Sequence, residues 1–384
     1  MDQHSKGTGL AEAAFALAFE GMEVEEVLAL RETPHWKLIR SADRARYERL
    51  LSTAVLDRHL RTDGTRSLRI SMADDSRNGS AAVPEHEYTM PDGRIDLPNL
   101  LMRFDEGASL VLAQFHESHP PLADFCRGLE RLFLHPVQAN IYLTPPGAQG
   151  FRTHYDTHDV LVMQVEGRKR WRVWDGEPVE RPTRNTPWPG KLKPEGEPHE
   201  FVMEPGDALY IPRGLMHDAA TEHGEPSLHI TVGFMEASWA QALRNLIDEM
   251  EQRDPRLRDS VPTWRIGEAD LQPELARRLD RLGGASEAGR LTSLLLEQLA
   301  RDRQPLPARG LFAPMPQSPL RLTEGMHTHL IQGDDGSATL FWSGGAMNLS
   351  PEEAEILAAF SEGAEPGGSD FAQRLWRMGL LERA

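Results

Sequence analysis

The chain has 384 residues, of which 39% are hydrophobic and 26% are charged. This length predicts two or three domains, and the composition is typical of a globular protein. No apolar run approaches the ~20 residues that a membrane-spanning helix needs, so we expect no membrane protein. Cys126 is the only cysteine, which excludes an internal disulfide and a thiolate-rich metal site and favours a reducing, cytoplasmic location.

The net charge of -17 argues against a general nucleic-acid binder, because phosphate backbones attract the opposite sign. An acidic chain suits a basic partner, but the same charge could serve solubility alone. Both interpretations stay open.

The first third of the chain predicts helices more than strands. Residues 10–19 predict an amphipathic helix behind a loose tail, and residues 74–87 predict a loop. Residues 100–133 favour helix again, with a break at residues 118–121. His116 and His119 lack the four-residue separation of the histidines in a zinc-binding helix, so an ordinary helix end is expected there.

Between residues 137 and 234 the pattern changes to short alternating runs. Turn residues separate these runs, among them a Pro-Pro-Gly and a Pro-Gly-Asp sequence. Short strands at this spacing predict a barrel or jelly roll. The expected strands are residues 139–143, 160–165, 168–174, 208–211 and 228–234.

After residue 234 the period becomes helical. Helices are expected from Ser238 onward, over residues 270–282 and over residues 286–301, with Ser238 and Gln241 as a capping box. The apolar face of each helix must be buried by packing, either against this chain or against a second copy of it. Of the two, we favour a homodimer through these helices.

A proline-rich linker over residues 304–319 precedes a small C-terminal region. An Asp-Asp-Gly sequence between residues 327–331 and 338–342 predicts a hairpin, and Ser350 predicts the N-cap of the next helix. Hairpin, helix, loop and helix together form a winged-helix-like pattern. This region has no evident basic helix, so direct DNA binding is not expected.

Three residues in the strand-rich region predict a metal site. His154 and Asp156 are separated by one residue, so on an extended chain their side chains point to the same face. His217 follows a short apolar strand and a Pro-Arg-Gly turn and could supply a third ligand. Two imidazoles and one carboxylate leave metal positions open for substrate and dioxygen, as in non-haem Fe(II) oxygenases. His158 stays a less favoured ligand, because it shares that face only if the strand continues unbent.

Lys169 is predicted to point into the barrel. It shares a strand face with Trp171 and Val173, and that face is more apolar than the opposite one. A buried lysine is costly unless it meets an anion, and the distal carboxylate of 2-oxoglutarate would be such an anion. The alternative is that Lys169 pairs with a protein carboxylate such as Asp207.

Two further strands have one polar face each, which suits the lining of a cosubstrate pocket. Asn140 and Tyr142 share such a face, and Ser227, His229 and Thr231 share another. These polar faces could also be simply exposed to solvent. For His229, solvent exposure and a supporting position next to the metal ligands are equally favoured.

These residues resemble the JmjC-type, cupin-like 2-oxoglutarate oxygenases, and within that family the ribosomal oxygenases. The matching segments lie within residues 137–234 and are NIYLTPPGAQGFRTHYDTHDVLVMQVEGRKRWRVW, GDALYIPRGLMHDA and SLHITVGF. The order of barrel, helices and C-terminal winged helix is also similar, so the resemblance is nearly full-length.

The resemblance implies an α+β fold, in which a double-stranded β-helix (a cupin-like JmjC jelly roll) precedes a helical dimerisation region and a winged helix. The implied domains are residues 1–236, 237–303 and 304–384. The implied metal ligands are His154, Asp156 and His217, the 2-oxoglutarate contacts are Lys169, Asn140 and Thr231, and the substrate contact is Tyr142. Gly233 departs from the family pattern, because some members have a substrate-binding serine there.

The activity implied by the resemblance is hydroxylation of a side chain on a ribosomal or other basic protein. Fe(II), 2-oxoglutarate and dioxygen are the implied cofactor and cosubstrates. Two alternatives remain at this point. The substrate could be the precursor peptide of a natural product, or the chain could be a cupin-like module that binds metal or peptide without oxidation.

Overall fold

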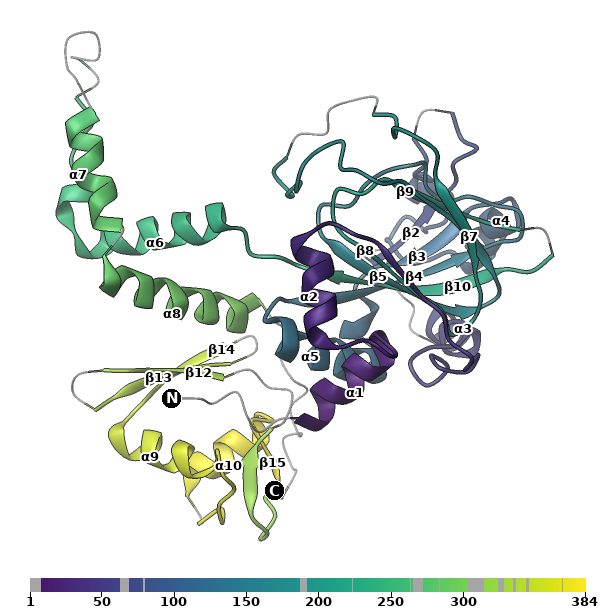
Figure 1. The fold of residues 1–384 in the computed structure, drawn as a ribbon. Helices are drawn as coiled ribbons and strands as arrows, with labels where there is room; N and C mark the ends of the chain where they lie inside the picture. The colour runs from purple at the N-terminus through teal and green to yellow at the C-terminus, as the bar shows by residue number, and fades with distance from the viewer. Residues whose placement is uncertain are drawn as a thin grey trace. The chain divides into compact units, whose positions relative to one another are not determined.

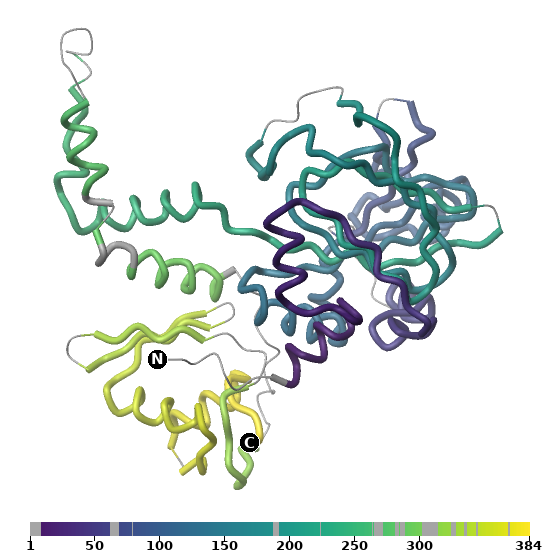
Figure 2. Tube along the Cα trace, in the orientation of Figure 1, coloured from purple at the N-terminus to yellow at the C-terminus, as the bar shows by residue number. Residues whose placement is uncertain are grey.

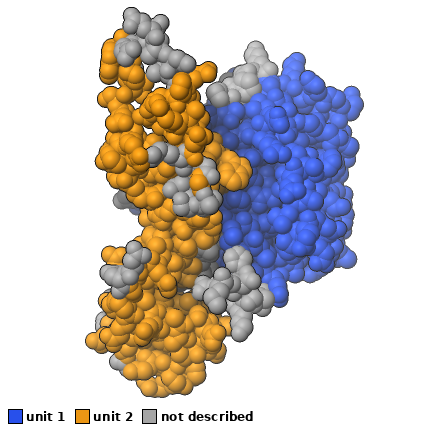
Figure 3. Space-filling view, turned by 60° about the vertical axis from the view of Figure 1, so that its left-hand side comes forward, with its two compact units in different colours: residues 1–236 blue, residues 237–384 orange. Residues whose placement is uncertain are grey.

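The computed structural model describes thirteen stretches of the chain. These are residues 8–62, 69–78, 80–186, 192–222, 224–262, 264, 272–282, 284–302, 314–323, 328–333, 336–342, 345–367 and 369–384. The chain divides into two compact units, residues 1–236 and residues 237–384 (Figure 3). Each unit has a hydrophobic core of its own. None of the helices in the described stretches is long and apolar enough to cross a lipid bilayer.

The first unit is built on two antiparallel sheets (Figure 1). In sheet order, the larger one contains β1 (Lys37–Ile39), β8 (Ala208–Ile211), β5 (Asp159–Glu166), β10 (Ser227–Phe234), β4 (Val137–Thr144), β3 (Ser109–Leu112) and β2 (Ile70–Ala73). The smaller one contains β7 (His199–Met203), β6 (Lys169–Val173) and β9 (His217–Thr221). The helices are α1 (Thr8–Ala18), α2 (Val24–Glu32), α3 (Thr53–Thr62), α4 (Leu97–Asp105) and α5 (Pro120–Phe133), with short 3-10 turns at Glu85–Glu87 and Phe115–Glu117.

The alternation of side chains along the central strands gives the larger sheet two different faces. On β10, Leu228, Ile230 and Val232 join the main core, in which apolar residues of α1 and α5 also lie. These two helices lie side by side (Figure 2). The opposite face meets the smaller sheet through a second core, to which Val162 of β5 and Val173 of β6 belong. This is the predicted jelly roll.

Strand β5 is buried on both faces, which explains its nearly continuous apolar sequence. It ends at Glu166, and after Gly167 the chain passes to β6 in the other sheet. Gly167 has a φ of 66°, and a Cβ on it would collide with the carbonyl oxygen of Pro226. Only glycine fits this turn without strain.

Five strands of the first unit differ from the prediction. Strand β3 lies within residues 100–133, where helix was predicted, and that prediction is wrong there. All four residues of β3 are buried, and so short an apolar run has no period that distinguishes strand from helix. Strands β1, β2, β7 and β9 were not predicted either. β9 has the sequence HDAAT, which contains few strand-favouring residues, and it is held by pairing with β6 along its whole length.

The second unit begins with three helices, α6 (Trp239–Arg253), α7 (Gln272–Leu282) and α8 (Ala285–Asp302), with a 3-10 turn at Pro255–Arg258. The side chain of Ser238 caps α6 as predicted, by accepting from Gln241 N. The carboxamide of Gln241 donates to Asn245 Oδ1 at 2.8 Å, so the capping box is not closed as predicted.

The rest of this unit forms a small α/β region. Its elements are β11 (Leu320–Leu322), β12 (Thr328–Gln332), β13 (Ala338–Trp342), β14 (Gly345–Leu349), α9 (Pro351–Ala359), α10 (Asp370–Arg377) and β15 (Leu381–Arg383). Strands β12 and β13 form the predicted antiparallel pair, and Ser350 with Glu353 forms the capping box of α9. Residues 304–313 of the predicted linker and Asp334 and Asp335 of the predicted turn lie outside the described residues.

Candidate metal centre and its cavity

The two ligand-bearing segments are joined directly through their backbones. His154 N donates to His217 O at 3.0 Å, and His217 N donates to His154 O at 2.8 Å, as an isolated antiparallel bridge. Beside it, Gly214 N donates to Asp156 O at 3.0 Å. These bonds fix the position of His217 at the start of β9 against the segment before β5.

The three predicted ligands converge. One potential ligand atom from each of His154, Asp156 and His217 lies within 4.8 Å of the other two. His217 Nε2 is 3.6 Å from Asp156 Oδ2, and the two imidazole centroids are 4.5 Å apart. Within the described stretches, no other group of three such side chains is this close. His158 does not belong to the group.

Both imidazoles are oriented by backbone carbonyls two residues upstream. His154 Nδ1 is 2.7 Å from Arg152 O, and His217 Nδ1 is 3.0 Å from Leu215 O. If each Nδ1 carries the proton that it donates, each Nε2 keeps a lone pair for a metal. Such outer hydrogen bonds are typical of metal-binding histidines.

The electrostatics also favour the metal-binding forms of these groups. Burial lowers the pKa of His217 to about 4, with His154 acting in the same direction, so its imidazole is neutral at neutral pH. Burial alone would raise the pKa of Asp156, but the imidazoles of His154, His217 and His158 hold it below its ordinary value. A neutral imidazole and an ionised carboxylate are the states that bind a metal.

A cavity of about 260 Å³ opens beside the three side chains and reaches Lys169. Its wall includes Tyr142, Trp171, His229 and Thr231. The polar faces predicted for β4 and β10, and the inward face predicted for β6, therefore line the cavity at these residues. Of the two alternatives for His229, the solvent-exposed position is wrong, because His229 is buried in the wall of the cavity.

Lys169 has no acidic partner among the described residues. Its side chain is 4% exposed, and Nζ donates to Thr144 Oγ1 at 2.9 Å. Burial lowers the pKa of Lys169 to about 7. Thr144 was not predicted as part of the site, because it ends β4 far from Lys169 in the sequence.

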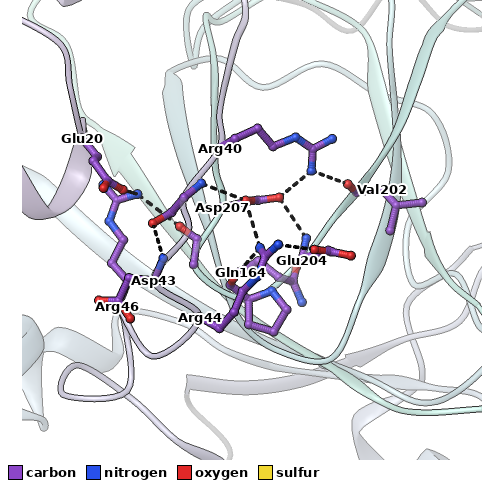
Figure 4. A network of polar contacts seen from close by, with 12 residues as sticks. Glu20, Arg40, Asp43, Arg44, Arg46, Gln164, Val202, Glu204 and Asp207 are labelled. Carbon is purple, nitrogen blue, oxygen red and sulfur yellow. Dashed lines mark hydrogen bonds and ion pairs between the residues drawn. The ribbon is translucent and has the colours of Figure 1, made fainter.

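The alternative partner Asp207 is already bound elsewhere (Figure 4). Its buried carboxylate accepts from Arg40 Nη1 at 2.5 Å and from Ser41 N at 3.2 Å, and it also pairs with Arg44. The predicted alternative, a pair of Lys169 with Asp207, is therefore wrong. Lys169 is left facing the cavity.

Other polar atoms of the cavity wall also lack partners among the described residues. Trp171 Nε1 and His229 Nδ1 are both buried without a hydrogen bond. Tyr142 stacks on His229 with their centroids 4.9 Å apart. Such buried, unsatisfied groups in a polar cavity are consistent with a bound ligand that has oxygen atoms.

Asn140 takes a less central position than predicted. It pairs with Thr231 in the register of β4 and β10, but its Oδ1 accepts from Gln114 N at 2.8 Å and it does not line the cavity. Gly233 lies under His158, because a Cβ at Gly233 would be 2.7 Å from ring atoms of that histidine. The imidazole of His158 thus fills the place where a larger residue at 233 would lie.

Comparison with known proteins agrees with this architecture. A family model described as JmjC domain matches residues 112–242. The chain is similar to the bifunctional lysine-specific demethylase and histidyl-hydroxylase NO66 of Aedes aegypti, with 35% identity over 209 residues, or 54% of this chain and 32% of that protein. For NO66 of Culex quinquefasciatus the identity is 31% over 232 residues, or 59% of this chain and 35% of that protein. The chain thus spans about a third of the length of these curated relatives.

Solved structures show the same fold over most of the chain. The X-ray structure of ycfD from Escherichia coli has a TM-score of 0.57 at 17% identity and covers 94% of this chain and 98% of that one. The E. coli ribosomal oxygenase YcfD in complex with cobalt and 2-oxoglutarate has a TM-score of 0.56 at 16% identity, with the same coverage. The sequence match, the jelly roll and the converging triad therefore agree on a JmjC domain over residues 112–242.

Proposed function

We propose that this chain is an Fe(II)- and 2-oxoglutarate-dependent oxygenase that hydroxylates a side chain of a protein. The decisive observation is that His154, Asp156 and His217 converge beside a cavity whose wall also contains Lys169, which has no acidic partner among the described residues. This arrangement combines a metal site with a separate anion site. A binding module for metal alone would need only the first.

The donor set fits iron. His154 and His217 would bind through Nε2 and Asp156 through a carboxylate oxygen, and two histidines with one carboxylate are the ligands of non-haem Fe(II) oxygenases. With iron, 2-oxoglutarate and dioxygen bound, such a site has the oxidising chemistry to insert one oxygen atom into a C–H bond, with succinate and carbon dioxide as co-products. The protein itself would position the substrate and cosubstrate and would exclude water from the site.

The cavity wall fits a dicarboxylic keto acid. The ammonium of Lys169 would pair with the distal carboxylate, and Thr144 already orients Nζ. Thr231 would contact the cosubstrate on the same wall, with Asn140 beside it on β4. Tyr142, stacked on His229, would contact the substrate.

The proposal is tested by measuring succinate release from 2-oxoglutarate. His154→Ala and Asp156→Ala should abolish it, because each removes one ligand of the triad. His199→Ala is the matched control, since His199 is half-exposed on β7 and bonds to Asp175 instead. Turnover of 2-oxoglutarate by either triad variant would contradict the assignment.

The expected substrate is a ribosomal protein, in the cytoplasm. The solved relative is named a ribosomal oxygenase, and the net charge of -17 suits a basic partner. Mass spectrometry of proteomes with and without the enzyme should show one ribosomal peptide that gains an oxygen atom. An unchanged ribosomal proteome would exclude this substrate and leave the precursor peptide of a natural product. The NO66 relatives are also named demethylases, so the loss of a methyl group should be sought in the same spectra.

The rival is a cupin-like module without catalysis. Equilibrium dialysis distinguishes the two, because the proposed enzyme takes up both Fe(II) and 2-oxoglutarate. A module that binds only the metal has no use for Lys169. Uptake of metal without uptake of 2-oxoglutarate would favour the rival.

The helices of the second unit are proposed to form a homodimer, and its C-terminal region is proposed to be a winged helix. Trp239, Leu243 and Ile247 recur at four-residue spacing on α6, and all three are exposed. Light scattering should report a dimer that Leu243→Glu converts to a monomer. Leu101→Glu on α4 of the first unit, where Leu101 is 50% exposed, is the control. A monomeric wild-type chain would contradict the dimer.

A further inference from the structure

Asp159 is a buried carboxylate to which neither the sequence nor the proposed chemistry gives a role. Asp159 is only 2% exposed. It is the first residue of β5, three positions after the ligand Asp156. Buried carboxylates are rare unless several groups bind them, so its partners indicate its task.

The partners of Asp159 come from α2 and from β8 with the turn that follows it. Tyr210 donates its hydroxyl to Oδ2 at 2.6 Å, and Arg31 Nε lies 3.1 Å from the same oxygen. Arg213 N donates to Oδ1 at 2.9 Å. Glu236 extends this cluster by pairing with both Arg31 and Arg213, at 2.7 and 3.0 Å.

The bond to Arg213 N matters most, because of where it stands along the chain. Val160 and Ile211 form the last pair of the β5–β8 ladder. Beyond it the β8 segment leaves the sheet, whereas Asp159 still pairs with Phe234 of β10. Each of the two segments then leads to metal-ligand residues. Pro212 has no N–H, so the ladder cannot continue there. The carboxylate of Asp159 binds the next N–H of the opposite segment instead.

We propose that Asp159 is a positioning residue for the metal centre, holding the segment of His154 and Asp156 in register with the segment of His217. The inference rests on the proposed metal site. Three backbone bonds already cross between the segments near the ligands, from Gly214 N to Asp156 O and in both directions between His154 and His217. Asp159 adds a side-chain bond at the base of this crossing. Without Asp159 all three ligand side chains are still present, but their positions relative to one another are less constrained.

Asp207 is a natural control for this role. It is also a buried carboxylate, and it also binds the arginines Arg40 and Arg44 (Figure 4) and two backbone N–H groups, those of Ser41 and Glu204. Arg40, Ser41 and Arg44 lie in the segment around β1 and Glu204 lies before β8, so none of the partners is in a segment that bears a metal ligand. Removing either carboxylate disturbs a comparable network. Only the loss of Asp159 should reach the metal.

The test is titration of the whole chain with cobalt(II), followed by the visible absorption bands of the bound ion. Asp159→Ala should weaken cobalt binding about tenfold, the lower end of the usual effect of residues that support metal ligands, and should alter the band pattern. Asp207→Ala should leave both unchanged. Asp159→Asn keeps an oxygen that can accept from Arg213 N, and it should recover most of the lost affinity.

A milder pair of variants covers the case in which Asp159→Ala does not fold. Tyr210→Phe removes one donor to Asp159, and Tyr47→Phe removes a buried hydroxyl that has no partner among the described residues. Tyr210→Phe should weaken cobalt binding by a few-fold and Tyr47→Phe should not. Equal cobalt affinity in the Asp159 and Asp207 variants, or in the two tyrosine variants, would overturn the inference. Failure of the wild-type chain to bind cobalt would overturn the metal site itself, and the inference with it.

Discussion

The affinity of this protein for 2-oxoglutarate should depend on pH through Lys169. Burial lowers the pKa of Lys169 to about 7 in the absence of a ligand. A carboxylate bound to the ammonium would raise that pKa again, because an opposite charge favours the charged form. Binding above pH 7 must therefore include the uptake of one proton.

The magnitude follows from this linkage. Below the free-state pKa of about 7, Lys169 is already protonated and the affinity should be flat. Above it, the dissociation constant should rise tenfold per pH unit until the pKa of the bound state is reached. Between about pH 6 and about pH 9 the loss is roughly a hundredfold, or about 2.7 kcal/mol of binding free energy.

Isothermal titration calorimetry of the metal-loaded protein measures this directly. Titrations in two buffers of different ionisation enthalpy should show uptake of about one proton at about pH 9 and almost none at about pH 6. Lys169→Arg is the control, because a guanidinium stays charged throughout this range. Metal occupancy is checked at each pH, so that loss of metal is not mistaken for loss of the anion site. An affinity for 2-oxoglutarate that is constant over this range would refute the reasoning.

Three further predictions concern stability. Lys169→Met should raise the free energy of unfolding by about 1 kcal/mol near pH 6, because the buried lysine that it replaces is charged there. The same variant should no longer bind 2-oxoglutarate. A lower free energy of unfolding in urea denaturation would contradict this prediction. Gly233→Ser should destabilise by about 1–3 kcal/mol, because its Cβ meets the ring of His158, and His158→Ala should relieve that cost in a double-mutant cycle. Arg40→Ala should cost about 1 kcal/mol in the same assay, since Arg40 is half-exposed while the carboxylate that it binds is buried; no loss would mean that Ser41 and Arg44 suffice.

The central strands could be predicted because their side-chain period is two and one face is apolar. On β10 the alternation of Leu228, His229, Ile230 and Thr231 is visible in the sequence, and the structure places the two sets on opposite faces. The same argument placed Lys169 and Trp171 inside. Strand period depends only on neighbouring residues, so a single sequence contains it.

The edge strands and β3 could not be predicted on that basis. β9 begins with the ligand His217 and continues with Asp218 and two alanines, a sequence with little preference for strand. What makes it a strand is β6, more than forty residues away in the sequence, which pairs with all five of its residues. Such pairing is a property of the sheet and not of the segment.

The metal triad lies between these two cases. The spacing of His154 and Asp156 predicts that they share a face, and the structure brings His217 to the same point. The hydrogen bonds that orient the two imidazoles could not be predicted from the sequence, because their acceptors are the backbone carbonyls of Arg152 and Leu215. A backbone carbonyl has the same chemistry in every residue, so no residue type marks it in advance.

The anion site shows the same limit in another form. Alternation gives the direction of Lys169 but not its neighbours, and two carboxylate partners were possible, one from the protein and one from a ligand. Asp207 is excluded only because Arg40 and Arg44, brought to it by the chain around β1, already occupy its oxygens. The predicted direction of a buried cation therefore predicts a ligand only when every protein carboxylate that could bind the cation is known to bind other residues. For Lys169 this holds among the described residues, and the pH dependence of 2-oxoglutarate binding follows from it.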